Sequence, residues 1–360
     1  MKFDSRLKIK SLHHDYVVTF DSSVAELAEY TERYVNKVVV VDATVADLYR
    51  ETLSSVLTAV PTYVVPATEA TKTLEGVQAL VDWLLDQKCN RSTTIIGIGG
   101  GIIQDLVTFT SNIFYRGASF VLVPTTLLSM CDSCIGAKCG INYGSFKNQL
   151  GVIHAPVGVH IFSDFLDTLE DRDVKSGYGE ILKLAITGSR DAFDFLVEQV
   201  DANGLRGSHL LPLIQQSLEI KKQIIEEDEY EKDLRRILNY GHTFGHALEA
   251  LTNHAIPHGL AVCWGIDVIN YLQASQEPTT QSFFVEIHDF ISKHLEFRLV
   301  EFPSAEELVE MTKRDKKMQG SILNLAIPAG FGDLQIRPTN VDGTLVRTVK
   351  QYLETANVYA

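Results

Sequence analysis

Residues 94–105 read TIIGIGGGIIQD, a short apolar run that passes through four glycines into an apolar helical pattern. Glycines at a strand-to-helix turn let backbone N–H groups approach a phosphate, and the helix N-terminus adds a favourable dipole. The spacing differs from the G-x-G-x-x-G fingerprint of dinucleotide sites. The segment therefore predicts a strand, a turn and a helix, with either a nucleotide site or a tight structural turn at the glycines.

Short apolar runs alternate with amphipathic stretches on both sides of this segment. The run VVVV at 38–41 precedes a helical pattern over 44–57, and the run YVV at 63–65 precedes another over 73–85. This alternation predicts a mostly parallel sheet built from crossover units. We expect an N-terminal, Rossmann-like α/β nucleotide-binding domain over residues 1–163.

The pattern changes after about Asp164, where strand-like runs nearly disappear. Helical periodicity dominates the remainder of the chain. The helical segments are 192–200, 211–225, 234–251, 260–272, 280–294 and 305–313. We expect a mostly α-helical C-terminal domain over residues 164–360, with a small-molecule site between the two domains.

Composition and charge restrict the function further. The 360 residues are 45% apolar and 22% charged, which is typical of a globular protein. Because 46 acidic residues outnumber 32 basic ones, the net charge of −14 argues against a nucleic-acid partner. The sequence has no membrane-length apolar run and no signal-peptide core near its start, and its five cysteines suit a reducing compartment. We expect a soluble cytoplasmic protein without a membrane partner.

Four of the eleven histidines lie close together, at His242, His246, His254 and His258. His242 and His246 stand four positions apart on one helical face, a spacing that can chelate zinc. A catalytic zinc commonly takes three protein ligands, and Glu180 is a candidate to complete the set. The alternative is that these histidines are ordinary packed or exposed side chains.

A set of basic and amide side chains, several of them beside glycines and apolar residues, is a candidate anion site. If they converge, they can hold a sugar phosphate or a carboxylate, whereas each alone is an ordinary solvated charge. They are Arg116, Lys138, Lys147, Asn148, Lys183, Lys221 and Arg235.

Cys131 and Cys134 form a C-x-x-C motif. A structural zinc would need a second such pair, and a redox role would need a thioredoxin-like context. Neither is visible in the sequence, so we interpret the cysteines as small residues of a packed loop.

Taken in order, these motifs resemble the dehydroquinate synthase family of sugar phosphate cyclases. The resemblance runs from about Ala67 to Gly259, with a weaker trace at residues 315–317 (DKK). Its segments are the glycine turn ending at Asp105, YRG at 115–117, PTTLL at 124–128, DS at 132–133, GAK at 136–138, GIN at 140–142, KN at 147–148, EILK at 180–183 and GHTFGH at 241–246. Each motif is weak alone, and their common order and spacing carry the resemblance.

The resemblance implies a dehydroquinate synthase-like fold, NAD in the N-terminal domain and a divalent metal, zinc or cobalt. The implied metal ligands are Glu180, His242 and His258. His246 then faces the substrate phosphate, contrary to the simple i, i+4 interpretation. The implied NAD contacts are Asp42, Glu69, Lys72, Gly101, Asp105, Thr125, Thr126, Asp132, Lys147, Phe165 and Thr168.

The resemblance also implies the substrate contacts and the catalytic groups. The implied substrate contacts are Arg116, Lys138, Asn148, Lys183, Lys221, Arg235, Asn239 and His246. The implied catalytic residues are Lys138, Lys183, Glu231 and His246. Arg116 is expected to reach the site of a neighbouring subunit, which implies a homodimer.

In the implied reaction a metal holds two adjacent substrate hydroxyls, and NAD transiently oxidises one of them. The resulting ketone acidifies the neighbouring C–H, and phosphate is eliminated. The hydride then returns and an intramolecular aldol step closes a carbocycle, so the enzyme is a lyase with no net redox change. Much of the protein's contribution is to hold one flexible substrate in successive reactive geometries.

Lys221 and Arg235 occupy the positions that hold a substrate carboxylate in the dehydroquinate-forming branch. They favour 3-deoxy-arabino-heptulosonate 7-phosphate as substrate and 3-dehydroquinate, a shikimate-pathway compound, as product, because a bidentate arginine suits a carboxylate. The alternative for Arg235 is that it neutralises Glu229 or Glu231 nearby.

Four departures from the family pattern keep other activities open. Leu260 stands where the family usually has Glu, Gly179 where Ala is common, residues 137–139 (AKC) where Gly-Lys-Thr is usual, and Asn324 where a basic residue contacts phosphate. One alternative is a divergent cyclase, similar to an epi-valiolone synthase, acting on sedoheptulose 7-phosphate or another sugar phosphate. Others are a metal-dependent alcohol dehydrogenase, which would accumulate NADH, and a binding protein without activity.

Overall fold

The computed structural model describes residues 4–21, 23–144, 146–299, 301–313, 318–320 and 322–357. The trace at 315–317 that contributes to the family resemblance lies outside the described residues. The chain divides into two compact units. The first comprises Met1–Glu170 with Ile225–Tyr230, and the second comprises Asp171–Ile224 with Glu231–Ala360.

A seven-stranded sheet in the order β1-β2-β9-β6-β5-β3-β4 forms the centre of the first unit as described. All neighbours from β2 to β4 pair in parallel, and β1 pairs antiparallel with β2 at the edge. The strands are β1 (Arg6–Ile9), β2 (Tyr16–Asp21), β3 (Lys37–Asp42), β4 (Thr62–Val65), β5 (Thr94–Gly99), β6 (Ser119–Pro124) and β9 (Gly158–Phe162). The parallel α/β sheet that the alternating runs predict is confirmed.

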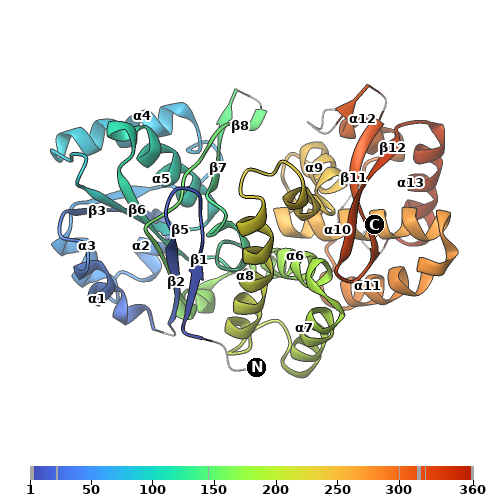
Figure 1. Cartoon of the computed structure of the whole chain (residues 1–360), viewed down its shortest axis with the longest axis horizontal. Coiled ribbons are helices and arrows are strands. Elements are labelled where there is room, and N and C mark those ends of the chain that lie inside the picture. The colour runs from blue at the N-terminus through green and yellow to red at the C-terminus, as the bar shows by residue number, and fades with distance from the viewer. Residues whose placement is uncertain are drawn as a thin grey trace. The chain divides into compact units, whose positions relative to one another are not determined.

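Helices cover both faces of this sheet (Figure 1). The helix after the glycine turn, α5, packs on β5 and β6 with α4 beside it, and the shorter helices lie on the opposite face. The helices are α1 (Leu27–Glu32), α2 (Ala43–Leu48), α3 (Ser54–Ala59), α4 (Leu74–Asp86) and α5 (Gly101–Ile113). Because both faces are covered, the central strands are largely apolar, and residues 38–41 are all at most 2% exposed.

An antiparallel ribbon, β7 (Lys138–Tyr143) and β8 (Phe146–Ile153), extends from the first unit (Figure 1). Most of its residues are exposed or half-buried, and Tyr143 and Phe146 at its tip are 61% and 64% exposed. Because neither face of the ribbon is buried along its length, its strands do not require a run of apolar residues. Hydrophobic periodicity in the sequence therefore does not predict these two strands.

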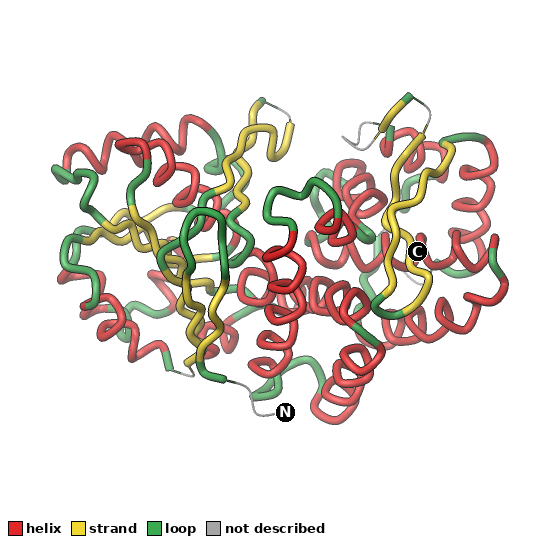
Figure 2. The backbone as a smooth tube through the Cα atoms, viewed as in Figure 1, coloured by secondary structure: helices red, strands yellow, loops and turns green. Residues whose placement is uncertain are grey.

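Helices dominate the second unit, as Figure 2 shows, and this confirms the predicted helical character of the C-terminal part. A small antiparallel sheet, β10-β11-β12, accompanies them. The elements are α6 (Asp171–Gly188), α7 (Arg190–Asn203), α8 (Leu210–Glu227), α9 (His242–Leu251), α10 (His258–Gln276), α11 (Gln281–His294), α12 (Ala305–Thr312), β10 (Met318–Gln319), β11 (Ile322–Gly330), β12 (Asp333–Asn340) and α13 (Gly343–Thr355). None of the helices in the described ranges combines the length and the apolar character that a bilayer crossing requires.

Helix α10 is the centre of the second unit, with contacts to α6, α9, α11 and α13. Glycines bring two of these helices unusually close to it. A Cβ atom on Gly179 of α6 would lie 2.0 Å from the carbonyl oxygen of Gly259, and one on Gly265 would lie 2.0 Å from the carbonyl oxygen of Gly241. Since no side chain separates the backbones there, α6 and α9 meet α10 backbone to backbone.

Candidate active site

The glycine crossings of the second unit bring Glu180, His242 and His258 together from α6, α9 and α10. Glu180 directly follows Gly179, and His258 directly precedes Gly259, so the closest backbone contact places these two side chains next to each other. The Nε2 atom of His258 lies 3.2 Å from Oε1 of Glu180, and the Nε2 atom of His242 lies 3.7 Å from the same oxygen. The structure thus gathers the three residues that the resemblance implies as metal ligands.

The other ring nitrogen of each histidine faces an acceptor. Nδ1 of His242 lies 3.1 Å from the carbonyl oxygen of Tyr240, and Nδ1 of His258 lies 3.1 Å from Oε2 of Glu249. A carbonyl or a carboxylate accepts a hydrogen bond and cannot donate one, which favours the proton on Nδ1 of both rings. A bound metal would then replace any proton on the two Nε2 atoms, which both face Glu180, so this donor set fits a divalent metal.

The carboxylates around His258 also make the position favourable for positive charge. Burial lowers the pKa of His258, but Glu249 and Glu180 outweigh it and raise the pKa to about 10. A charged carboxylate stabilises a neighbouring cation most strongly where water is excluded. Glu180 is buried, whereas the side chain of His258 is 35% exposed.

His246 lies in the same group. One nitrogen from each of His242, His246 and His258 falls within 4.8 Å of the others, so a three-histidine metal site is also geometrically open. His246 has an exposed side chain, 54% accessible, and its Nε2 lies 4.0 Å from Oε2 of Glu249. His254, the remaining histidine of the sequence cluster, is not part of the group.

Lys183 forms a buried ion pair with Oε2 of Glu180, the oxygen that does not face the histidines. The two residues stand at i and i+3 on α6, and their side chains are 3% and 2% exposed. The two oxygens of Glu180 therefore have different neighbours, an ammonium on one side and two imidazoles on the other. This contact fixes the orientation of the carboxylate.

Four further predicted residues lie elsewhere in the second unit. Lys221 on α8 and Arg235 on the 3₁₀ turn η5 (Leu234–Asn239) are buried, with 6% and 4% exposure. Nδ2 of Asn239 donates to Oε1 of Glu231 at 2.5 Å. Glu231 has a φ of 56°, in the left-handed region that non-glycine residues seldom adopt.

The predicted NAD contacts of the first unit follow the carboxyl ends of neighbouring parallel strands. Asp42 ends β3, the pair Glu69 and Lys72 follows β4, Gly101 and Asp105 follow β5, Thr125 and Thr126 follow β6, and Phe165 and Thr168 follow β9. These strands are adjacent in the sheet in the order β9-β6-β5-β3-β4. Open parallel sheets bind nucleotides at this edge. Asp132 lies in the π-helical turn η3 (Ser129–Ser133), and Lys147 lies on β8.

A buried ion pair stands at this edge. Nζ of Lys72 lies 2.6 Å from Oδ2 of Asp105, and the backbone N–H of Gly140 donates to Oδ1 of Asp105 at 2.9 Å. Burial raises the pKa of Asp105, although the charge of Lys72 opposes this shift. The pair connects the loop after β4, the first turns of α5 and the ribbon β7–β8.

Asn142 on β7 links predicted cofactor and substrate residues, although the sequence analysis gives it no role. Its Nδ2 donates to Oε2 of Glu69 at 2.7 Å, and its Oδ1 accepts the backbone N–H of Asn148 at 3.0 Å. Burial raises the pKa of Glu69, but the hydrogen bond from Asn142 and the charges of Lys72 and Lys147 lower it below its usual value. Asn142 and the adjacent Ile141 are buried on a ribbon whose other residues are exposed or half-buried, so the structure and not the sequence indicates this role.

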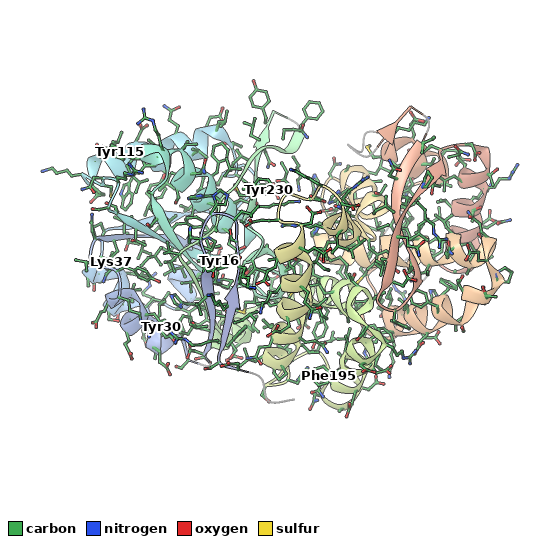
Figure 3. All side chains as sticks on the ribbon, viewed as in Figure 1. Tyr16, Tyr30, Lys37, Tyr115, Phe195 and Tyr230 are labelled. Atoms are coloured by element: carbon green, nitrogen blue, oxygen red, sulfur yellow. The ribbon has the colours of Figure 1, made fainter. Side chains whose placement is uncertain are left out.

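Lys138 begins β7 after two residues with left-handed backbone, Gly136 (φ 96°) and Ala137 (φ 60°). Tyr16 on β2, labelled in Figure 3, holds this turn because its hydroxyl accepts the backbone N–H of Gly136 at 3.2 Å. A cavity of about 40 Å³ adjoins the turn. It is lined in part by Gly101, Asp105, Ser133, Lys138 and His154.

Arg116 lies on the surface of the first unit, beyond the end of α5. Tyr115 and Arg116 both have left-handed backbone, with φ of 49° and 62°, and Tyr115 is 47% exposed (Figure 3). The expected contact of Arg116 with a neighbouring subunit stays a prediction. Cys131 and Cys134 are buried free thiols, which agrees with a packing role, but they lie in and directly after the π-helical turn η3 and not in a loop.

The sequence is similar to that of known enzymes across most of its length. The model of the 3-dehydroquinate synthase N-terminal domain matches residues 62–176, and that of the C-terminal domain matches residues 177–318. A 3-dehydroquinate synthase from Thermoanaerobacter sp. (strain X514) is 32% identical over 338 residues, which cover 92% of this chain and 95% of the relative. The chain belongs to the 3-dehydroquinate synthase family. The resemblance that its motifs indicate is thereby confirmed.

Solved structures of related cyclases share the fold. A 2-deoxy-scyllo-inosose synthase complexed with carbaglucose-6-phosphate, NAD+ and Co2+ has a TM-score of 0.85 at 22% identity, covering 96% of this chain and 99% of that chain. A 2-epi-5-epi-valiolone synthase from Streptomyces hygroscopicus subsp. jinggangensis 5008, with NAD+ and Zn2+ bound, has a TM-score of 0.82 at 25% identity, covering 97% and 98%. The predicted dehydroquinate synthase-like fold is confirmed.

Proposed function

We propose that this member of the 3-dehydroquinate synthase family converts 3-deoxy-arabino-heptulosonate 7-phosphate to 3-dehydroquinate and phosphate, using NAD and a divalent metal, zinc or cobalt. The observation that carries the proposal is the pair of Nε2 atoms, from His242 and His258, directed at one oxygen of Glu180. The family relationship over both domains supports it.

Glu180, His242 and His258 would hold the metal. When bound, the metal would polarise substrate hydroxyls, and NAD would accept and return a hydride at the same carbon. Lys183 holds the second oxygen of Glu180 and places a positive charge beside the ligand set. Such a charge would stabilise a substrate oxygen that becomes more negative during proton removal.

Two residues of the helical unit are suited to roles toward the substrate. His246 is exposed and has a titratable nitrogen near the ligand group, so it can bind the substrate phosphate and exchange a proton with it. Glu231 accepts from Asn239 and so fixes the orientation of its amide, which would bind a substrate oxygen. In the first unit, Lys138 and Asn148 would bind the phosphate, and the residues at the carboxyl edge of the sheet would bind NAD.

Arg235 and Lys221 would bind the carboxylate of the substrate. Both are buried basic residues, and a guanidinium can donate two parallel hydrogen bonds to a carboxylate. The proposal includes a homodimer in which Arg116 reaches the neighbouring subunit's site. The exposed left-handed turn that carries Arg116 supports this part.

A second candidate is a cyclase for a sugar phosphate without a carboxylate, such as sedoheptulose 7-phosphate. Two observations favour it. Asn324 lies half-buried on β11 where a basic residue is expected, and Leu260, which replaces the expected Glu, is buried on α10. Both changes remove a charge from the implied site.

The deciding experiment measures phosphate release from 3-deoxy-arabino-heptulosonate 7-phosphate and, in parallel, from sedoheptulose 7-phosphate, with NAD and Zn2+ present. We expect release from the first substrate alone, without lasting NADH absorbance at 340 nm, because the hydride returns in each turnover. Release from the second substrate alone would establish the specialised cyclase. Accumulating NADH without phosphate release would identify a dehydrogenase.

A further inference from the structure

Glu249 is a buried carboxylate next to the proposed metal ligands. It lies on α9 at i+3 from His246 and is 7% exposed. Its Oε2 lies 3.1 Å from Nδ1 of His258 and 4.0 Å from Nε2 of His246. A carboxylate is costly to bury, so its place between two histidines calls for a stabilising interaction there.

We propose that Glu249 is a positioning residue of the metal site: it holds the His258 ring in the orientation and tautomer that present Nε2 toward Glu180. This inference rests on the proposed function, which supplies the metal. Nδ1 of His258 donates to a group that can only accept, so Nδ1 keeps its proton, and a metal would bind at Nε2 in place of the proton there. The carboxylate charge also makes the imidazole a more basic ligand.

The backbone of His258 is already held by other contacts. The N–H of Gly259 donates to Oγ of Ser176 at 3.0 Å, and a Cβ atom on Gly259 would lie 1.7 Å from the carbonyl oxygen of Ser176. These contacts place the Cα of His258 but leave its ring free to rotate about two side-chain torsions. The hydrogen bond to Glu249 restrains those torsions.

Glu249 itself is positioned by the turn between α9 and α10. The backbone N–H of His254 donates to the carbonyl oxygen of Glu249 at 2.8 Å, and His254 adopts a left-handed φ of 61°. The chain reverses direction there and begins α10 at His258. The end of α9 and the start of α10 therefore meet at the Glu249–His258 contact.

His242 provides an internal comparison. Its Nδ1 faces the carbonyl of Tyr240, which is part of the backbone and cannot be removed by substitution. His258 relies on a side chain for the same purpose. Substitution of Glu249 therefore tests the anchor of one histidine while the anchor of the other stays in place.

The test uses Glu249→Gln and Glu249→Ala in the full chain. The glutamine keeps an acceptor oxygen and loses the charge, whereas alanine loses both. Cobalt affinity is measured by competition with a chelator, and the visible absorption of bound Co2+ reports the geometry around the metal. Removal of such an outer carboxylate typically weakens metal binding by about 10- to 100-fold. We expect the Kd for Co2+ to rise by about tenfold in Glu249→Gln, and further in Glu249→Ala together with an altered cobalt spectrum.

Glu229→Gln is the matched control. Glu229 is equally buried, at 7% exposure, and its carboxylate accepts from the Ser11 hydroxyl and the Leu12 N–H at 2.7 and 2.8 Å. These contacts lie within the first unit, whereas the proposed ligands belong to the second. We expect the control to keep the wild-type Kd for Co2+.

The outcomes separate this inference from the proposed function. If the unmodified chain binds neither Co2+ nor Zn2+, the metal part of the proposed function fails and the inference fails with it. If the unmodified chain binds Co2+ and folded Glu249→Gln binds it within twofold of the same Kd with the same spectrum, only the positioning role is overturned. If Glu249→Ala does not fold, as shown by the lack of a cooperative thermal transition, the Kd for Co2+ and the cobalt spectrum of Glu249→Gln alone test the positioning role.

Discussion

The two units assemble their candidate sites in different ways. In the first, Asp42, Gly101, Thr125 and Phe165 come from separate strand ends, and they share a region because parallel strands end at one edge of a sheet. In the second, the proposed ligands lie on helices, where glycines bring the backbones together. A site spread along a sheet edge depends on topology, whereas a site at a helix crossing depends on one close contact.

We therefore expect the site at the helix crossing to be more sensitive to single substitutions than the contacts at the sheet edge. Loss of one contact at the sheet edge leaves the strands in register and the other contacts in place. Loss of one glycine or one ligand at the helix crossing changes the spacing of every ligand there. The experiments below test this difference, from the largest expected effect to the smallest.

His258→Ala has the largest expected effect. It removes one of three proposed ligands, so bound metal and activity should both be lost. Metal content after dialysis, measured by mass spectrometry, checks this. The control is His254→Asn, since His254 is outside the ligand group and Asn tolerates its left-handed backbone. Stoichiometric metal in His258→Ala would contradict the ligand assignment.

The same glycine-to-alanine change in each unit compares the two modes of assembly directly. Gly259→Ala places a Cβ atom 1.7 Å from the carbonyl oxygen of Ser176, so α6 and α10 must separate. We expect a loss of about 3 kcal/mol in the free energy of unfolding and weaker metal binding. Gly101→Ala meets its nearest atom, Oγ of Ser133, only at 4.0 Å and should change stability by less than about 1 kcal/mol. Equal losses in urea denaturation would refute the proposed difference.

Arg235→Ala tests the carboxylate-binding role in the helical unit. We expect kcat/KM for 3-deoxy-arabino-heptulosonate 7-phosphate to fall by about 10- to 100-fold, mostly through KM, because a charged hydrogen bond is lost and its partner left unpaired. The adjacent Arg236→Ala serves as control. Steady-state phosphate release gives both constants, and an unchanged kcat/KM would show that Arg235 does not contact the substrate.

Asn142→Ala tests the polar network at the sheet edge. Glu69 and the Asn148 backbone would each lose a buried hydrogen bond, worth about 1 kcal/mol. We expect the Kd for NAD, measured by calorimetry, to rise by about fivefold, with metal affinity unchanged. Gln149→Ala removes an exposed amide on the same ribbon and should leave the Kd for NAD unchanged. A change in metal affinity in Asn142→Ala would argue against independent sites.

The smallest expected effect is on the pH dependence of the thermal midpoint. In the second unit, Nδ1 of His288 lies 2.9 Å from Oδ2 of Asp267, and the Tyr352 hydroxyl donates to the same oxygen at 2.8 Å. The hydrogen bond to Asp267 raises the pKa of His288 despite partial burial. A raised folded-state pKa stabilises the fold below the unfolded value of about 6.5, and this contribution is lost as pH rises through the folded value. The thermal midpoint should therefore fall as the pH rises above about 6.5.

His288→Gln should remove that part of the pH dependence, since glutamine does not titrate. Thermal unfolding of both proteins across neutral and mildly alkaline pH checks the difference. Identical pH profiles would show that the Asp267–His288 pair does not contribute.

The fold was largely predictable because its signals are local. Strand runs such as residues 38–41 and the glycine turn after β5 keep their form in the structure. The predicted helix over 44–57 is instead two short helices, α2 and α3, because periodicity does not show where a helix breaks. The ribbon β7–β8 carries no apolar run and could not be expected from periodicity.

The candidate site was less predictable. The spacing of His242 and His246 indicated a metal-binding pair with Glu180 as a candidate third ligand, and the family resemblance kept Glu180 and replaced His246 with His258. The structure shows that all three histidines lie within reach of one position, with Glu180 facing two of them. Neither Glu249 nor Asn142 was expected, because each acts through a contact to another residue.

The sequence by itself determined the parallel α/β unit, the helical unit, the family and the chemical types of the candidate ligands, since periodicity and motif order are properties of the chain. Only the tertiary structure decided which of those ligands meet. Glu180 and His258 are distant in sequence, and they are neighbours because Gly179 and Gly259 let α6 and α10 touch without side chains between them. Such a contact depends on the packing of whole helices, which no local pattern encodes.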